Sequence, residues 1–114
     1  MKIAFLGSNE KEVQALNIFF LKNFAPKEGL ELRYVSNSRM EYYNKNTGDL
    51  YYIRIMNPSI KGYKFNRIFY SRSIYMNDNF NEDNMYYIYS TLIVRDESDR
   101  NNTVVELSLE DFME

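Results

Sequence analysis

The residues that could perform chemistry in this 114-residue chain are carboxylates, hydroxyls and cations, because the sequence contains no Cys and no His. Without a thiol or an imidazole, the commonest nucleophile–base pairs and most transition-metal sites are ruled out. Two acidic groups offer oxygen ligands that suit a hard cation, although neither has EF-hand spacing: Asp78, Glu82, Asp83 and Asp96, Glu97, Asp99. We therefore predict no catalytic residue, no cofactor and no metal site, and a protein that is not an enzyme.

The segment from Leu50 to Met76 combines cations with aromatic rings and contains no Asp or Glu. Single-stranded nucleic acids bind to such surfaces, since cations pair with phosphates and rings stack on bases, and protein interfaces also favour Arg and Tyr. Outward charges over inward rings in an ordinary strand pair would give the same pattern. The sequence pI near 5.2 favours a protein partner over a nucleic acid. The predicted partner-binding residues are Arg54, Lys61, Tyr63, Lys64, Phe65, Arg67 and Arg72.

The charges are divided unevenly along the chain. Residues 1–76 carry 12 Lys and Arg against 6 Asp and Glu, whereas residues 77–114 carry 2 against 10, so the two parts have net charges of +6 and −8. One interpretation is that the acidic part folds back on the basic part and neutralises it. The other is that a charged face remains for a partner.

One helix is expected near the start of the chain. The apolar run from Lys2 to Leu6 predicts a buried strand that ends at Gly7. Asn9 is the expected N-cap of a helix over residues 10–24, and Glu12, three residues later, would complete a capping box. The helix has an apolar face of Val13, Leu16, Phe20 and Phe24, which Ile18, Phe19 and Leu21 widen.

Alternating apolar and polar residues predict the strands that this helix covers. They lie at Leu30–Ser36, Arg39–Tyr43, Leu50–Met56, Asn66–Ile74, Met85–Val94 and Thr103–Leu109, and the last two would form a final hairpin. The polar run Asn44–Asp49 suits a hairpin loop. We predict a single α+β domain over residues 1–114, with one N-terminal helix packed on a mixed or antiparallel sheet of about six to seven strands.

The sequence also bears on localisation. It contains no apolar stretch long enough to span a membrane, and the apolar run at Met1–Gly7 is too short for a signal sequence. The absence of Cys removes a reason to place the chain in an oxidising compartment. We therefore expect a cytoplasmic protein that has no membrane partner.

Part of the chain resembles a known family. The predicted strand, Gly-containing turn and helix, the hairpin from Met40 to Met56 and the run from Lys61 to Tyr70 together resemble the ATPase core of phage terminase large subunits and related P-loop helicases. In that family the first turn carries G-x-x-x-x-G-K-[ST], and an acidic pair holds Mg²⁺. Here the turn reads Gly7-Ser8-Asn9-Glu10-Lys11, and Ser71-Arg72 stand in place of the acidic pair. The resemblance implies a nucleotide-binding scaffold without hydrolytic chemistry.

Together these features predict a non-enzymatic binding protein. The richness in Asn, Lys and Tyr is typical of A/T-rich bacterial genomes and their phages. We expect a phage-encoded inhibitor or regulator, of the anti-defence or anti-CRISPR type, that occupies a site on a host protein or ribonucleoprotein in the host cytoplasm. The alternatives are a nucleic-acid-binding accessory protein that uses segment 50–76 and a degenerate nucleotide-binding domain.

Overall fold

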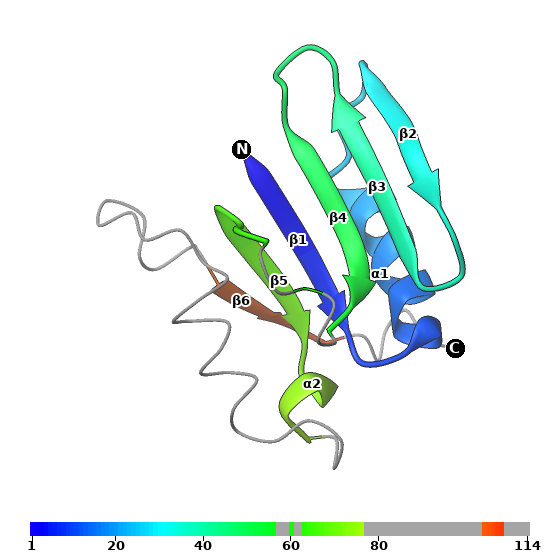
Figure 1. Ribbon diagram of the computed structural model, residues 1–114, viewed down its shortest axis with the longest axis vertical. Coiled ribbons are helices and arrows are strands. Elements are labelled where there is room, and N and C mark those ends of the chain that lie inside the picture. The colour runs from blue at the N-terminus through cyan, green and yellow to red at the C-terminus, as the bar shows by residue number, and fades with distance from the viewer. Residues whose placement is uncertain (57–59, 61–62, 77–103, 109–114) are drawn as a thin grey trace.

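A computed structural model describes residues 1–56, 60, 63–76 and 104–108 (Figure 1). These residues form one six-stranded sheet, with strand order β2-β3-β4-β1-β5-β6, and two helices. The elements in chain order are β1 (Lys2–Gly7), α1 (Glu10–Asn23), β2 (Leu30–Val35), β3 (Arg39–Asn44), β4 (Leu50–Ile55), β5 (Arg67–Ser71), α2 (Ser73–Met76) and β6 (Val104–Leu107).

The sheet is mixed, which decides between the two predicted arrangements. β1 lies near the centre and runs parallel to both β4 and β5, and β5 is parallel to β6. β2, β3 and β4 form an antiparallel meander on the other side of β1. The predicted α+β fold, with one N-terminal helix packed on a sheet of about six strands, is confirmed.

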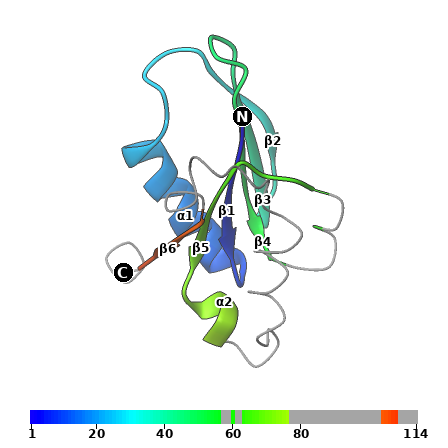
Figure 2. The same cartoon turned by 90° about the vertical axis from the view of Figure 1, so that its left-hand side faces the viewer.

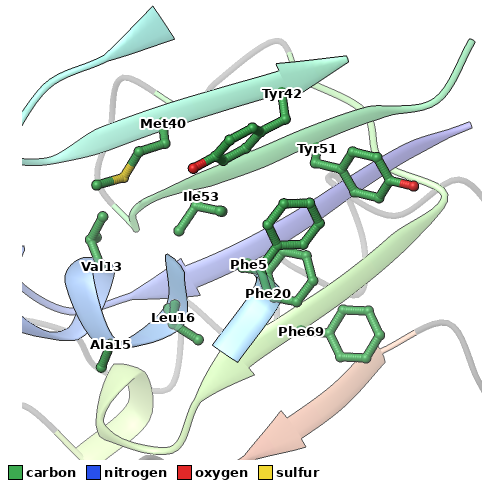
Figure 3. Close-up of a cluster of buried hydrophobic side chains, with 10 residues drawn as sticks. All are labelled: Phe5, Val13, Ala15, Leu16, Phe20, Met40, Tyr42, Tyr51, Ile53 and Phe69. Carbon is green, nitrogen blue, oxygen red and sulfur yellow. The ribbon is translucent and has the colours of Figure 1, made fainter. Parts of the chain in front are cut away.

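Helix α1 packs on one face of the sheet (Figures 2 and 3). Its buried residues include Val13, Leu16 and Phe20, as the helical spacing predicts. Phe20 lies edge-on to Phe5 of β1 with ring centroids 5.5 Å apart, and Phe5 stacks on Phe69 of β5 at 4.9 Å. These contacts join the helix to the two central parallel strands.

The apolar face of α1 is narrower than the sequence predicts. The exposed large hydrophobic residues include Ile18 and Leu21, which were expected to widen the buried face, and Phe24, which was expected to belong to its stripe. At about 100° per residue, Ile18 and Leu21 point well away from the stripe formed by Val13, Leu16 and Phe20. Only a sheet reaching further around the helix would cover them.

A second cluster of buried hydrophobic residues lies on the sheet face opposite α1. It brings together Ile68 and Tyr70 of β5 with Ile74, the residues that the alternation places on one face. The predicted strand nevertheless ends at Ser71, and Ile74 belongs to the short helix α2. The predicted extension of this strand to Ile74 was wrong. A helical turn, and not a continued strand, places Ile74 on the same face as Ile68 and Tyr70.

The remaining predicted elements are resolved in part. The hairpin loop between β3 and β4 is confirmed, with Gly48 at φ +79°, a conformation that favours glycine. The last predicted strand becomes β6, Val104–Leu107, which pairs in parallel with β5. The predicted strand Met85–Val94, and so the final hairpin, lies outside the described residues.

Candidate functional site

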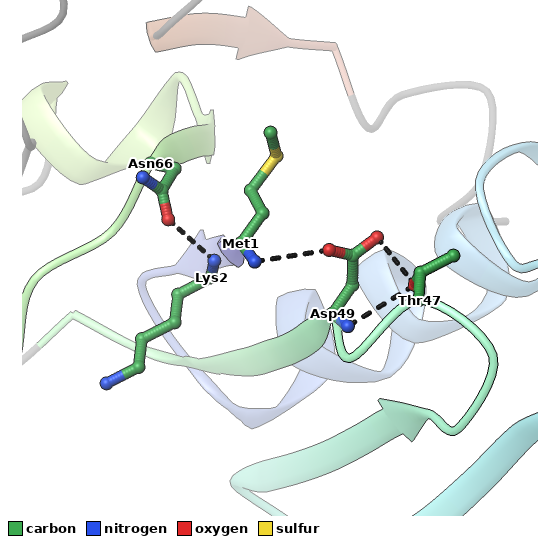
Figure 4. Close-up of polar contacts among 5 residues, drawn as sticks. All are labelled: Met1, Lys2, Thr47, Asp49 and Asn66. Atoms are coloured by element: carbon green, nitrogen blue, oxygen red, sulfur yellow. Dashed lines mark hydrogen bonds and ion pairs between the residues drawn. The ribbon is translucent and has the colours of Figure 1, made fainter.

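Cationic side chains gather at the edge of the sheet where the parallel strands begin, which we call the N-terminal rim. Lys2 and Asn66 exchange two hydrogen bonds. The Lys2 N–H donates to Asn66 Oδ1 at 2.7 Å (Figure 4), and the Asn66 N–H donates to the Lys2 carbonyl at 2.8 Å. Arg67 is then the register partner of Ile3. Lys2 and Arg67 therefore lie at the starts of neighbouring strands, where the register directs their side chains to opposite faces of the sheet, and Lys64 lies three residues before Arg67 in the chain.

The positive charge of the N-terminal rim comes from side chains. Lys2 and Lys64 are exposed and Arg67 is half-buried. The Met1 ammonium lies 3.2 Å from a carboxylate oxygen of Asp49, which neutralises it (Figure 4). Lys2, Lys64 and Arg67 are the cationic side chains at this end of the strands.

The predicted partner-binding residues do not form one surface. Arg54 and Phe65 are buried, at 4% and 0% exposure, and Lys61 lies outside the described residues. Arg72 is exposed, but it follows the last residue of β5, whereas Arg67 is the first. Five residues at about 3.3 Å each separate these two by about 17 Å along the strand. Of the predicted set, the structure brings together Arg54, Tyr63 and Phe65, while Lys64 and Arg67 lie three residues apart in the chain at the start of β5.

Most of the aromatic rings of segment 50–76 that the structure describes face inward. Five of them are buried: Tyr51, Tyr52, Phe65, Phe69 and Tyr70. Tyr63 is half-buried, and its ring lies 5.6 Å from that of Tyr52 and 5.9 Å from that of Phe65. The guanidinium of Arg54 lies over the same ring, 4.9 Å from its centroid. These rings pack against each other, so a base could not stack on them without unfolding the second cluster.

A polar cluster joins the β1–α1 turn to the β5–α2 turn. The Glu12 carboxylate accepts hydrogen bonds from the Ser8 N–H, the Ser8 hydroxyl and the Ser73 hydroxyl, each at 2.7 Å. The Ser73 hydroxyl also lies 3.0 Å from that of Ser71. Ser8 and Glu12 follow the end of β1, whereas Ser71 and Ser73 lie at the end of β5. The cluster therefore fixes the carboxyl ends of β1 and β5 relative to α1.

The predicted capping box is half correct. Asn9 caps α1, since its side-chain oxygen accepts from the Glu12 N–H at 2.9 Å. The Glu12 carboxylate reaches back to Ser8 instead of Asn9. The helix packs very closely here: a Cβ on Gly7 would lie 3.0 Å from the Glu12 Cβ and 3.2 Å from a Leu16 methyl. The close packing and the Ser73 hydroxyl together explain why the carboxylate turns toward β5.

These contacts determine the chemical state of Glu12. Burial raises the pKa of its carboxyl, but hydrogen bonds from Ser73 and Ser8 lower it by more, so the pKa lies below its ordinary value. A carboxylate with a lowered pKa that already accepts several hydrogen bonds is a poor general base. It also gives the Ser8 N–H an anionic acceptor within the chain. We interpret the cluster as a structural clamp.

Comparisons with known proteins add no relative. No protein-family model, curated protein or solved structure matches this sequence. Within the described part of the chain, no helix is long and apolar enough to cross a membrane. The acidic groups at residues 78–83 and 96–99 lie outside the described residues.

Sequence reasoning missed Lys2, which joins the N-terminal rim only through the parallel pairing of β1 with β5. Nothing local in the sequence signals that pairing. It also missed the exposure of four large apolar residues on β2 and α1: Ile18, Leu21, Leu32 and Val35. Alternation correctly predicted the strand that carries Leu32 and Val35, but alternation does not reveal which strand lies at the edge of a sheet.

Proposed function

We propose that this chain is a non-enzymatic binding protein whose N-terminal rim contacts an acidic surface of a protein partner. The observation that carries this proposal is the pairing of β1 with β5, which brings the first residues of the two strands, Lys2 and Arg67, to one end of the sheet, with Lys64 three residues before Arg67. The side chains are exposed or half-buried in a chain whose net charge is −2. A local cationic edge on an acidic protein steers a complementary partner and disfavours other surfaces.

The burial of the rings supports a protein partner over a single-stranded nucleic acid. Cations alone can neutralise phosphates, but stacking on exposed rings is what holds bases on such surfaces. In segment 50–76 the five buried rings serve the core instead. The reduced nucleotide-binding alternative has less support, because the Ser8 N–H in the first turn already donates to Glu12.

The biological role that fits these properties is inhibition or regulation by occupation of a site. We place the protein among small phage-encoded regulators of the anti-defence or anti-CRISPR type, acting on a host protein or ribonucleoprotein in the host cytoplasm. The support is the Asn-, Lys- and Tyr-rich composition.

Capture from a bacterial lysate tests this function. The bait would be the full chain, with and without nuclease treatment of the lysate, beside a Lys64→Glu/Arg67→Glu variant. We expect a protein that survives nuclease treatment, is retained by the parent and is lost with the variant. Retention of nucleic acid alone, released by nuclease, would support the nucleic-acid alternative and contradict the proposal.

A matched control separates the rim from general charge effects. Arg72→Glu reverses a cation of the same segment at the opposite end of β5. This variant should retain the captured protein as the parent does. Equal loss with Arg72→Glu and with the rim variant would show that net charge, and not the N-terminal rim, governs binding.

A further inference from the structure

The exposed apolar residues of β2 and α1 are unusual for a surface that contacts only water. Leu32 and Val35 on β2 are 55% and 62% exposed, and Ile18 and Leu21 on α1 are 45% and 48% exposed. We call these four residues the β2–α1 surface. Isolated exposed apolar residues need no explanation, but a group on adjacent elements marks an interaction site.

The register places Leu32 and Val35 on the α1 side of the sheet. Leu32 is directly opposite Tyr42 and Val35 is opposite Met40, and both β3 residues belong to the cluster that α1 covers. Residues directly opposite in an antiparallel pair point to the same face. Leu32 and Val35 therefore continue the apolar face that α1 covers as far as the edge strand β2, where they are exposed.

Two hydrogen bonds show which flank of α1 faces β2 and β3. Gln14 Nε2 donates to the carbonyl of Asn37 in the β2–β3 turn at 3.1 Å, and the Tyr42 hydroxyl donates to Asn17 Oδ1 at 2.7 Å. Positions 14, 17, 18 and 21 share one helix face, since they are spaced by three, four and seven residues. Ile18 and Leu21 therefore lie on the flank of α1 that is turned toward the β2–β3 side of the sheet, which carries Leu32 and Val35.

β2 is the last strand on this side of the sheet (Figure 1). Five of its six residues are exposed. Its pairing with β3 shifts register between Leu32 and Tyr34, a bulge of the kind that limits indiscriminate strand addition at an edge. A strand that adds to this edge must therefore match the side chains of β2 as well as its main chain.

The charges on β2 identify that partner. Glu31 and Arg33 flank Leu32 and lie on the face away from α1, since Glu31 is opposite Tyr43 and the Arg33 guanidinium lies 3.9 Å from the Tyr43 ring centroid. If two β2 strands meet antiparallel with Leu32 at the centre, Glu31 of each faces Arg33 of the other. The segment is thus complementary to itself in charge.

We propose that the β2–α1 surface binds a second copy of this chain, with β2 antiparallel to β2 and the two Leu32 side chains meeting on a two-fold axis perpendicular to the sheet. Such an axis keeps both α1 helices on the same side, so the β2–α1 surfaces of the two copies face each other and cover their apolar residues. Glu31 and Arg33 form two ion pairs on the opposite side. Because each copy uses its only β2, association stops at the dimer. The N-terminal rims are left free, so this inference is independent of the proposed function.

The mass in solution tests the proposal directly. Sedimentation of the full chain should give twice the 13.7 kDa of one chain at micromolar concentrations and dissociate on dilution. Leu32→Lys, which brings two ammonium groups together on the axis, should weaken the dimer at least 100-fold and leave the melting temperature of the monomer unchanged. Asn37→Lys, at an exposed turn residue outside the β2–α1 surface, is the matched control and should leave the dimer intact. A parent that stays monomeric at every concentration, or an unchanged Leu32→Lys dimer, would overturn the proposal.

An exchange of charge between Glu31 and Arg33 tests their pairing even where a variant loses some stability. Glu31→Arg places Arg opposite Arg33, and Arg33→Glu places Glu opposite Glu31, so each variant alone should dimerise about tenfold or more weakly than the parent. Mixed in equal amounts, they should form heterodimers in which both ion pairs are present, one as in the parent and one with its two charges exchanged. A mixture that sediments no faster than its two components would refute the pairing of Glu31 with Arg33.

Discussion

The hydroxyl of Ser73 donates a hydrogen bond to the carboxylate of Glu12 at 2.7 Å, across 61 residues of sequence. Ser73 begins α2, and Glu12 lies in the first turn of α1. The bond therefore connects two helices that start at the carboxyl ends of neighbouring parallel strands. This clamp holds the segment that follows β5 against the first turn of α1.

Removal of the Ser73 hydroxyl should weaken the fold measurably. Ser73→Ala leaves the buried Glu12 carboxylate with Ser8 as its partner and should lower the free energy of unfolding by about 1–2 kcal/mol. Ser108→Ala, at an exposed position, should change it by less than about 0.5 kcal/mol. Chemical denaturation of both variants gives the comparison, and equal midpoints would show that the clamp contributes nothing.

The state of Glu12 predicts how stability depends on pH. Its pKa in the folded protein is lowered, so the carboxylate stabilises the fold above the unfolded pKa of about 4.3, and this contribution is lost as the pH falls through the folded value. Glu12→Gln should therefore be less stable than the parent at neutral pH. The difference should shrink steadily in acid. A difference that stays constant from pH 7 to pH 3 would contradict the assigned direction of the shift.

The cap of α1 gives a local stability prediction. Asn9→Ala removes the acceptor for the Glu12 N–H and should cost about 1 kcal/mol, or about 4 °C in melting temperature. Lys45→Ala, in the exposed hairpin loop, should cost almost nothing. Thermal melting of the two variants decides the matter, and coincident curves would mean that Asn9 does not cap the helix.

Local sequence signals predicted the helices and strands well, but they did not predict which strands lie next to each other in the sheet. Asn9, Gly7 and the apolar spacing of Val13, Leu16 and Phe20 locate α1, because caps and periodicity act within a few residues. The position of β1 between β4 and β5 depends on contacts between residues more than 40 positions apart. That pairing decides which cations gather at the rim. Segment 50–76 is continuous in the sequence and therefore suggested one surface. In the structure, its side chains are divided between the two faces of the sheet and between the two ends of its strands.

The absence of enzymatic chemistry remains a prediction that can be tested simply. Glu12 is held by serine hydroxyls, and the first turn lacks the Lys-Ser or Lys-Thr that would stabilise charge on a transferring phosphoryl group. Purified protein should not hydrolyse ATP or GTP above the buffer rate when Mg²⁺ is present. Turnover that is abolished by Lys11→Ala would contradict this expectation.

The central claim is that Lys64 and Arg67 at the N-terminal rim bind an acidic protein surface. Titration of the purified partner against the full chain tests it most directly. Lys64→Glu/Arg67→Glu should weaken the affinity by about 3 kcal/mol, or about 100-fold, while Arg72→Glu binds as the parent does and all three proteins melt alike. Rim and control variants that bind with the parent's affinity would contradict the account.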